Sequence, residues 1–342
     1  QLKTLNLTDE DITLATNFSL DLSGIKLDSI LGSIYLRETY LKYNENDIVF
    51  DSLLFSSQRN QTERDVRFVS DQFNAQFLGD FEFSTLLSEL KDINEQYKLV
   101  FSSRRDEALA YANKNVANTP FNIRYDIALD NISPVLQLFD TSVYVSKNAL
   151  IQGRFSNDEF ENFTLNAEAD SVKWANISFF TNSISINANN LKNLNSVLTL
   201  GQVQSKQQQY ANTAQTQDLD LIAIWDGEKI NFEQKIEQES SGNRTDIKAQ
   251  VDFFKDSTIL TFQEAKLKAL NEEWNISENN RVLFGERRID IKDLSITNRD
   301  QTISFDGAIA VTKDSSKRMF PTIIPNVISE GLASLACEAL GV

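Results

Sequence analysis

Two aspartates separated by one residue, Asp218 and Asp220, have the spacing most suggestive of catalysis in this sequence. In an extended strand both side chains point to the same side, about 6.6 Å apart along the chain. Glycosidases place two carboxylates across the bond that they cleave, at a comparable separation. Asp220 is followed by Leu221-Ile222-Ala223-Ile224, so the pair is readily explained as the polar face of one strand. No surrounding motif supports catalysis.

Other groups that carry chemistry are scarce. The acidic run Asp9-Glu10-Asp11 has the ligand type that Ca²⁺ prefers, but it lacks a twelve-residue loop with a central glycine, so we interpret it as a turn. The sequence contains no histidine, which excludes Ser-His-Asp and Cys-His catalysis and the common zinc sites. Its single cysteine, Cys337, excludes an internal disulfide. We therefore expect a non-enzymatic protein that binds no metal and no cofactor.

The net charge of the chain bears on whether it binds nucleic acid. Lys and Arg number 33 and Asp and Glu number 49, which leaves a net charge of −16. Such a chain lacks the positive surplus that displaces counterions from nucleic acid, so we expect no nucleic-acid partner. No apolar run approaches the roughly 18 residues of a transmembrane helix. We interpret the chain as an internal segment of a longer protein.

Period-two alternation of apolar and polar residues is the main structural signal. It is clear in residues 18–24, 163–169, 247–253 and 303–307, and it recurs in roughly 20 segments spaced by about 8–12 residues. The 11 glycines and 4 prolines fall well below the average usage of about 7% and 5%. The sequence therefore predicts a mainly β fold with long strands and simple turns, elongated rather than compact.

Two stretches break this alternation with helical periodicity. Residues 84–98 place apolar side chains at i, i+3, i+4 and i+7, and Ser84 is a candidate N-cap. Residues 104–115 form a second, alanine-rich candidate, and Pro134-Val135-Leu136-Gln137-Leu138-Phe139 predicts a further single turn. We interpret the helices as an apolar plug that closes the end of a sheet. The face of the first helix carries acidic residues, which disfavours binding to anionic lipid.

The apolar side of the alternating strands is the candidate binding surface. In a two-sheet sandwich it would be an ordinary core, whereas in an open, folded-over sheet it would form a groove for an acyl chain. Alternation does not separate these arrangements. The predicted lining residues are Phe18, Leu20, Leu22, Phe163, Leu165, Leu219, Leu221, Val251, Phe253, Ile291 and Phe305.

The order of several segments resembles a known family. The segments are Asn17–Leu22, Leu31–Leu36, Leu150–Phe155, Glu273–Asn280 and Arg67–Gly79, the last being a Ser-Asp pair, a strand and a glycine ahead of the helix that begins near Ser84. Over roughly residues 1–310, this order is similar to that of the TamB-like proteins of Bacteroidota, in the AsmA-like superfamily. Each motif alone is weak, and the evidence lies in their order.

The resemblance implies a β-taco, which is a long U-shaped sheet with an apolar concave side. It further implies a membrane-associated periplasmic protein, anchored in the inner membrane through a part that is not in this sequence. Such a protein conducts phospholipid between the inner and outer membranes or assists outer-membrane assembly and protein secretion, acting with a BamA- or TamA-like barrel.

We divide the chain into residues 1–116, which carry the inserted helices, residues 117–312, which continue the sheet, and an atypical tail at 313–342 that departs from the family pattern. The first hypothesis is a non-enzymatic lipid-conducting or assembly scaffold. The alternative is a secreted or surface β-solenoid interaction module, such as an adhesin segment. A hydrolase ranks third.

Overall fold

The structure is a computed structural model that describes residues 12–24, 26–112, 119–137, 140–157, 161–210, 214–238, 240–269, 271–285, 288–299 and 301–310. Asp9-Glu10-Asp11 and residues 313–342 lie outside these ranges. Three helices are described: α1 (Phe83–Phe101), α2 (Arg105–Ala112) and α3 (Ser133–Gln137). The strands are β1 (Ile12–Ser23), β2 (Leu31–Tyr43), β3 (Asn46–Asn60), β4 (Glu63–Ser70), β5 (Asn74–Asp80), β6 (Asn122–Leu129), β7 (Val143–Val145), β8 (Ala149–Asn157), β9 (Glu161–Trp174), β10 (Ile177–Asn189), β11 (Leu198–Tyr210), β12 (Ala214–Asp226), β13 (Lys229–Gln238), β14 (Asn243–Phe253), β15 (Ser257–Ala269), β16 (Glu272–Ile276), β17 (Arg281–Gly285), β18 (Arg288–Asn298) and β19 (Gln301–Ala310).

All 19 strands belong to one antiparallel sheet, in which strands that follow one another in the chain pair with each other, except at β6–β7, β7–β8 and β16–β17. Two positions are filled by broken strands: β7 and β8 both pair with β9, and β16 and β17 both pair with β15. The α1–α2 insertion does not interrupt the ladder, because β5 pairs directly with β6. The predicted mainly β class is confirmed, and the two-sheet sandwich is wrong because there is one sheet.

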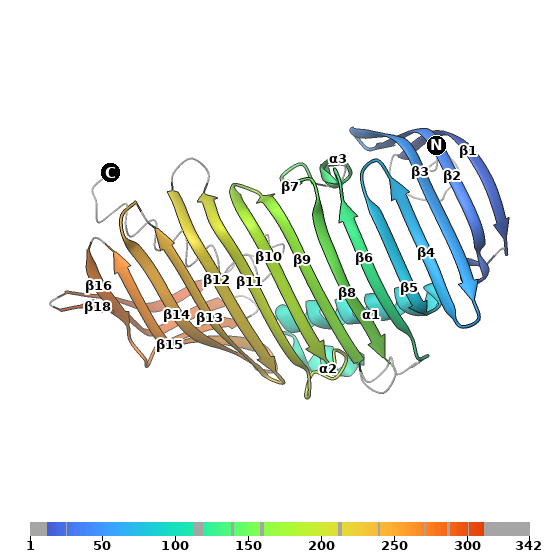
Figure 1. Cartoon of the computed structure of the whole chain (residues 1–342). Helices are drawn as coiled ribbons and strands as arrows, with labels where there is room; N and C mark the ends of the chain where they lie inside the picture. The colour runs from blue at the N-terminus through green and yellow to red at the C-terminus, as the bar shows by residue number, and fades with distance from the viewer. Residues whose placement is uncertain are drawn as a thin grey trace.

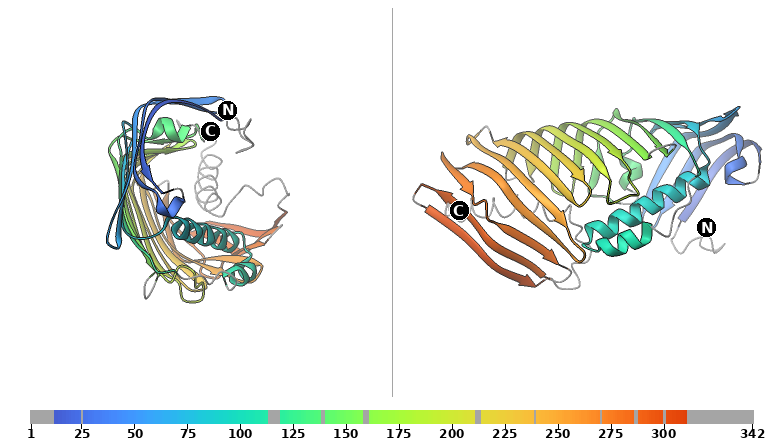
Figure 2. Two further views of the ribbon diagram at one scale, coloured as in Figure 1. Left: turned by 90° about the vertical axis from the view of Figure 1, so that its right-hand side faces the viewer. Right: turned by 90° about the horizontal axis from the view of Figure 1, so that it is seen from below.

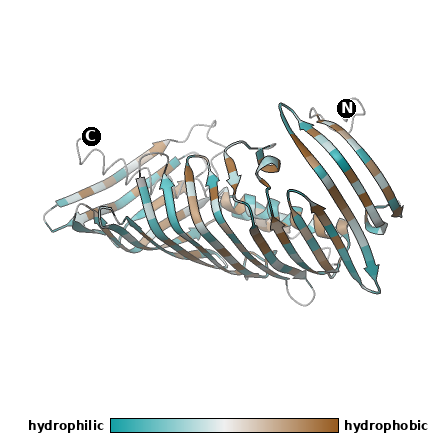
Figure 3. Cartoon of the chain, turned by 45° about the horizontal axis from the view of Figure 1, so that its top comes forward, coloured by the Kyte–Doolittle hydropathy of each residue, from teal (hydrophilic) through white to brown (hydrophobic). Residues whose placement is uncertain are grey.

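The sheet is long and curved (Figure 1). Seen end-on it bends into an open curve, and α1 lies within that curve (Figure 2). We call the face of the sheet on which α1 packs the inner face, and the opposite one the outer face. Hydrophobic segments of neighbouring strands lie beside one another (Figure 3), as alternation in a continuous register requires.

β-Bulges interrupt the alternation at several points. Phe262 and Ala265 are three residues apart and yet both belong to the same buried cluster, because the register shifts between β14 and β15. Ile291 and Leu294 likewise both pack on that cluster, across a register shift at which Asp293 has a φ of 53°. A bulge adds one residue to a strand and increases its local bend and twist. These residues therefore keep apolar side chains on one face while the sheet curves.

Side chains bind carbonyl groups where a residue with left-handed backbone interrupts the ladder. Beside Thr181, which has a φ of 53°, the Asn182 amide donates to the carbonyl oxygen of Ala169 at 3.2 Å. The Ser205 hydroxyl donates to the carbonyl oxygen of Phe180 at 3.2 Å, and the Gln208 amide donates to that of Ser205 at 2.7 Å. Ser205 and Gln208 are buried, so these bonds replace ladder bonds where water is excluded.

The three helices occur where they are predicted, although α1 continues to Phe101 and residues 113–115 and 138–139 of the predicted helices lie outside the described ranges. The helices do not close an end of the sheet, because α1 packs along its inner face. Ser84 is not the N-cap, because α1 begins at Phe83 and its N-cap residue is Glu82. The cap comes instead from Asp28, whose carboxylate accepts the Ser84 backbone N–H at 2.9 Å and the Ser84 hydroxyl at 2.5 Å. These bonds lower the pKa of Asp28. A distant carboxylate thus satisfies the helix terminus.

We expect small-angle scattering to give a radius of gyration clearly above the roughly 20 Å of a compact chain of this length. The reason is that antiparallel strands advance about 4.8 Å each, so a single sheet of this many strands is necessarily long. A value near the compact one would contradict the extended sheet.

Two glycines of the inner face provide a matched test of packing. Gly153 and Gly201 belong to one register row, linked through Leu165 and Ile186. A Cβ at Gly153 would overlap the carbonyl oxygen of Thr164 and the hydroxyl of Tyr125, whereas a Cβ at Gly201 would meet nothing within 4 Å.

Gly153→Ala should therefore lower the free energy of unfolding by about 1–3 kcal/mol, as overpacking does. Gly201→Ala should leave it unchanged or raise it slightly, because alanine reduces the entropy of the unfolded chain. Urea unfolding of both variants measures the difference. Equal losses would show that the space above Gly201 is filled.

Candidate functional site

The structure places all eleven predicted lining residues on the inner face. They do not share one environment. Phe18, Leu20 and Leu22 on β1 are exposed, by 65%, 55% and 38%. Val251 and Phe253 are buried in the larger core cluster and are covered by other side chains. The remaining six are half-buried: Phe163, Leu165, Leu219, Leu221, Ile291 and Phe305.

Helix α1 covers one margin of the inner face. Its side chains Phe83, Leu86 and Ile93 pack against a cluster that includes Phe155 and Phe163 of the sheet. At the start of the helix, the buried Arg64 guanidinium lies 4.9 Å from the centre of the Phe83 ring and pairs with Glu82 at 3.1 Å. The helix therefore crosses β4 to β10 with an apolar face against the strands, as its sequence period predicts.

The far end of α1 is held by aromatic packing. Tyr97 and Phe101 contact the Trp225 ring, with centroid distances of 5.1 and 5.6 Å, and Phe253 lies 6.0 Å from Phe101. Edge-to-face pairs of this kind add to the free energy of burying the rings. This packing covers Phe253, which explains why alternation alone misplaces it as an accessible lining residue.

A polar lock joins the middle of α1 to the sheet. The Lys192 ammonium group contacts the Glu89 carboxylate of α1 and lies 3.8 Å from the Glu161 carboxylate of β9. The Glu161 carboxylate also accepts the Lys192 backbone N–H at 2.7 Å, and the Gln96 amide donates to the Lys192 carbonyl oxygen at 2.8 Å. Burial raises the pKa of Glu161, and the bond to Lys192 opposes that shift.

An apolar row adjoins this covered margin, and three of its members, Phe55, Phe68 and Leu221, pack against the buried clusters. The row is formed by residues that are directly opposite one another on successive strands. We call it the inner row. It crosses eleven strand positions without a polar residue and ends where Gln234 follows Leu221 on β13. Its members are Leu20, Ile34, Phe55, Phe68, Ala75, Ile127, Ile151, Ala167, Ile184, Val203 and Leu221.

The inner row retains access to solvent. Leu20 and Ile184 are 55% and 37% exposed, Ala75 is buried, and the other members are half-buried. At about 4.8 Å per strand, the row is about 48 Å long. It runs across the strands, along the length of the sheet. An apolar strip of this length, which no other strand of the described residues covers, can bind an apolar ligand without a closed cavity.

Two leucines of α1 add apolar surface beside the row. Leu87 and Leu90 are 57% and 46% exposed, although they belong to the helix that covers the sheet. At 100° per residue they lie on the opposite flank from Asp92, which accepts a hydrogen bond from Tyr111 of α2. They therefore face away from α2, and their exposure is not explained by packing within the described residues.

The outer face has the opposite character. Glu233, Lys248 and Glu264 are directly or nearly opposite one another on β13, β14 and β15, and ion pairs at 3.1 Å or less link Lys248 to Glu264 and Lys266 to Glu264. Opposite charges across strands stabilise a wet sheet face modestly. Apolar residues are exposed there as well: Ile224 is directly opposite Leu200 on β11, and the two side chains are 44% and 50% exposed.

Asp218 and Asp220 do not form a pair with shared partners. Asp218 has a φ of 49° at a bulge and binds the Lys206 ammonium group at 3.2 Å. Asp220 accepts a hydrogen bond from the Gln202 amide at 3.0 Å. The bulge breaks the regular alternation that put both carboxylates on one side, so each is explained locally. No group of three or more metal-ligating side chains occurs in the described ranges.

The sequence reasoning missed most members of the inner row. Ile34, Phe55, Phe68, Ile127 and Ile151 lie on strands that carry an available signal, because each has apolar residues two positions away on the same strand or directly opposite on the next. This signal was missed because these segments do not alternate regularly between apolar and polar residues. Only the pairing register shows that these residues align.

Comparisons with known proteins identify no relative: no protein family, curated protein or solved structure matches this chain. Among the helices described, none combines the length and apolar content needed to span a bilayer.

The polar lock predicts a specific pH dependence. A carboxyl group whose folded pKa is raised favours folding below its unfolded pKa and loses that contribution as pH rises through the folded value. Glu161→Gln removes this loss, so the stability of the variant relative to wild type should rise between pH 4 and pH 8. Urea unfolding at a series of pH values measures it.

Glu233→Gln is the matched control. Lys235 lowers the pKa of the Glu233 carboxyl, so this variant should lose stability relative to wild type as pH rises from about 3 to about 5, and the difference should stay constant above that. Slopes of the same sign for the two variants would contradict the burial of Glu161.

Proposed function

We propose that this chain is a non-enzymatic scaffold that holds acyl chains of phospholipid along the inner face of a β-taco and conducts them across the periplasm. The inner row is the observation that carries the proposal. It provides an apolar strip about 48 Å long that no other described strand covers, and two leucines of α1 are also exposed.

The physical basis is the hydrophobic effect. Burying each methylene group contributes about 0.8 kcal/mol and requires no directed contact, so a chain can bind at any point along such a strip. The inner row contains no polar side chain from β1 to β12, so no position along it favours a fixed headgroup. A ligand can thus be exchanged between neighbouring positions with little change in free energy.

Location and partner follow from the resemblance to TamB-like proteins. In this proposal the scaffold acts in the periplasm, associated with the inner membrane, and supplies lipid or assists protein assembly at a BamA- or TamA-like barrel. The segments Asn17–Leu22, Arg67–Gly79 and Glu273–Asn280 support it. The adhesin-like module is the alternative, and it requires no bound lipid.

Two isoleucines with similar exposure on opposite faces test the proposal. Ile184 lies on the inner row and is 37% exposed, and Ile224 lies on the outer face and is 44% exposed. Ile184→Asp should reduce lipid occupancy about tenfold, since burying an isoleucine side chain contributes about 1.5–3 kcal/mol. Ile224→Asp should leave it unchanged.

Native mass spectrometry of the purified protein measures the occupancy, and thermal unfolding shows that both variants fold. Both carboxylates reach solvent, so we expect both folds to survive. Equal occupancy in the two variants would contradict binding at the inner row. Wild-type protein without lipid would favour the adhesin-like module.

A further inference from the structure

Charged residues on the outer face follow a rule in the middle of the sheet. Between β13 and β15, each positive side chain has a carboxylate directly opposite it on at least one neighbouring strand. Arg244 and Lys268 face each other, but Glu237 and Glu273 are opposite them on their other sides. The Lys235 ammonium group lies 2.8 Å from Glu233, and Lys248 lies 3.1 Å from Glu264. These contacts raise the pKa of Lys235 and Lys248, as favourable pairing does.

Between β17 and β18 the arrangement differs, because Asp290, the carboxylate diagonal to Arg281, is paired with Arg288. Arg281 and Lys292 are directly opposite in the register, so two cations face each other across the strand pair. Like charges in this position destabilise a sheet. Within the described ranges, neither side chain has a carboxylate oxygen within 4.0 Å, which is the separation of an ion pair. Both side chains are exposed.

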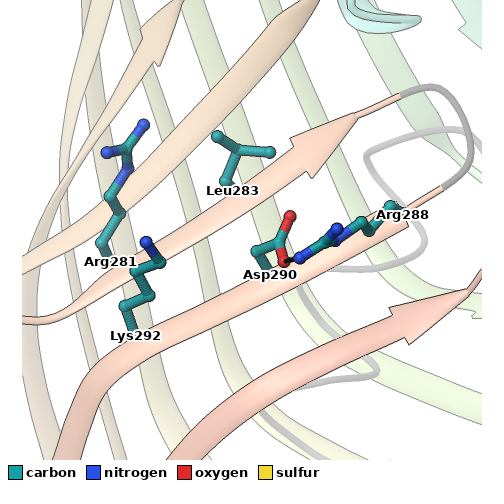
Figure 4. A pocket seen from close by; sticks show the side chains of 5 residues that line it. All are labelled: Arg281, Leu283, Arg288, Asp290 and Lys292. Carbon is teal, nitrogen blue, oxygen red and sulfur yellow. Dashed lines mark hydrogen bonds and ion pairs between the residues drawn. The ribbon is translucent and has the colours of Figure 1, made fainter.

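A third cation lies beside them. Arg288 binds the Asp290 carboxylate, with its Nε atom 2.6 Å from the nearer oxygen. Leu283 lines the same surface as these two residues and the pair Arg281 and Lys292. Figure 4 shows Arg281 and Lys292 side by side and Arg288 turned toward Asp290. The five residues line a surface depression of about 280 Å³. It holds three positive charges and one negative charge in a chain whose net charge is −16.

We propose that this depression binds a phosphate group, which bridges Arg281 and Lys292. A phosphate oxyanion supplies the negative charge that would offset the repulsion between these two facing cations. Guanidinium groups bind such an oxyanion through two parallel hydrogen bonds. The phosphate belongs either to a soluble ion or ester or to a phospholipid headgroup. The site is on the outer face, so it is independent of acyl binding at the inner row.

The test is thermal unfolding with inorganic phosphate at constant ionic strength, in wild type and in Arg281→Gln/Lys292→Gln. Lys235→Gln/Lys248→Gln is the matched control, because it removes the same two positive charges from the same face. Without phosphate, the site variant should be at least as stable as wild type, since it relieves repulsion. The control should be less stable, since it breaks ion pairs.

With phosphate at about ten times the dissociation constant, the melting temperature of wild type and of the control should rise by about 2 °C. The site variant should not respond. An equal rise in all three proteins, no rise in any of them, or a site variant less stable than wild type without phosphate, would overturn the proposal.

Vesicles separate the two sources of phosphate. Phosphatidic acid diluted into phosphatidylcholine presents a phosphate monoester at a membrane surface. Flotation of wild type, but not of the site variant, with these vesicles would assign the site to a headgroup. Absence of flotation together with the thermal response would assign it to a soluble phosphate.

Discussion

Continuous backbone pairing is the constraint on which the rest of this structure depends. From β1 to β19 each strand is fixed by hydrogen bonds to its neighbour, and side chains alternate between the faces of a sheet. A slip of one residue in any strand would move its apolar side chains to the outer face. The inner row, the seat of α1 and the charged outer face all therefore depend on one register, and they would be lost together.

Curvature is compatible with that register because the bulges are compensated. Thr181 and Asp218 adopt left-handed backbone conformations in the interior of their strands, which leaves ladder groups unpaired. Asn182, Ser205 and Gln208 supply the missing bonds from their side chains. Without these polar residues the same bend would bury unsatisfied carbonyl groups, each costing about 1–3 kcal/mol. Polar residues on the inner side of the sheet thus have a structural role.

Helix α1 determines how much of the inner face remains accessible. It is held at its start by Asp28 and Arg64, at its middle by Lys192, and at its end by the ring of Trp225. These anchors place the helix along one margin instead of the centre of the sheet. Because β5 and β6 pair directly beneath the insertion, the helix is an addition to the sheet and not a link in it.

The sequence by itself determined the β class, the long strands and the positions of the helices, because alternation and helical periodicity are local properties of the chain. It also placed the predicted lining residues on one face, since each strand such as Phe18–Leu22 carries its own pattern. It did not show that Ser84 depends on Asp28, which lies 56 residues earlier, or that Phe253 is covered by Phe101.

Only the tertiary structure decided which strands align and which residues are covered. Ile34 and Ile184 share a row because of pairings between segments far apart in the chain, and Arg281 faces Lys292 because of a register that their sequence positions do not encode. Bulges at residues such as Asp293 shift the alternation by one position, which no period-two pattern anticipates. The pairing register, and which side chains are covered by others, depend on contacts between segments that are distant in the chain. The free energy of each such contact depends on the whole sheet.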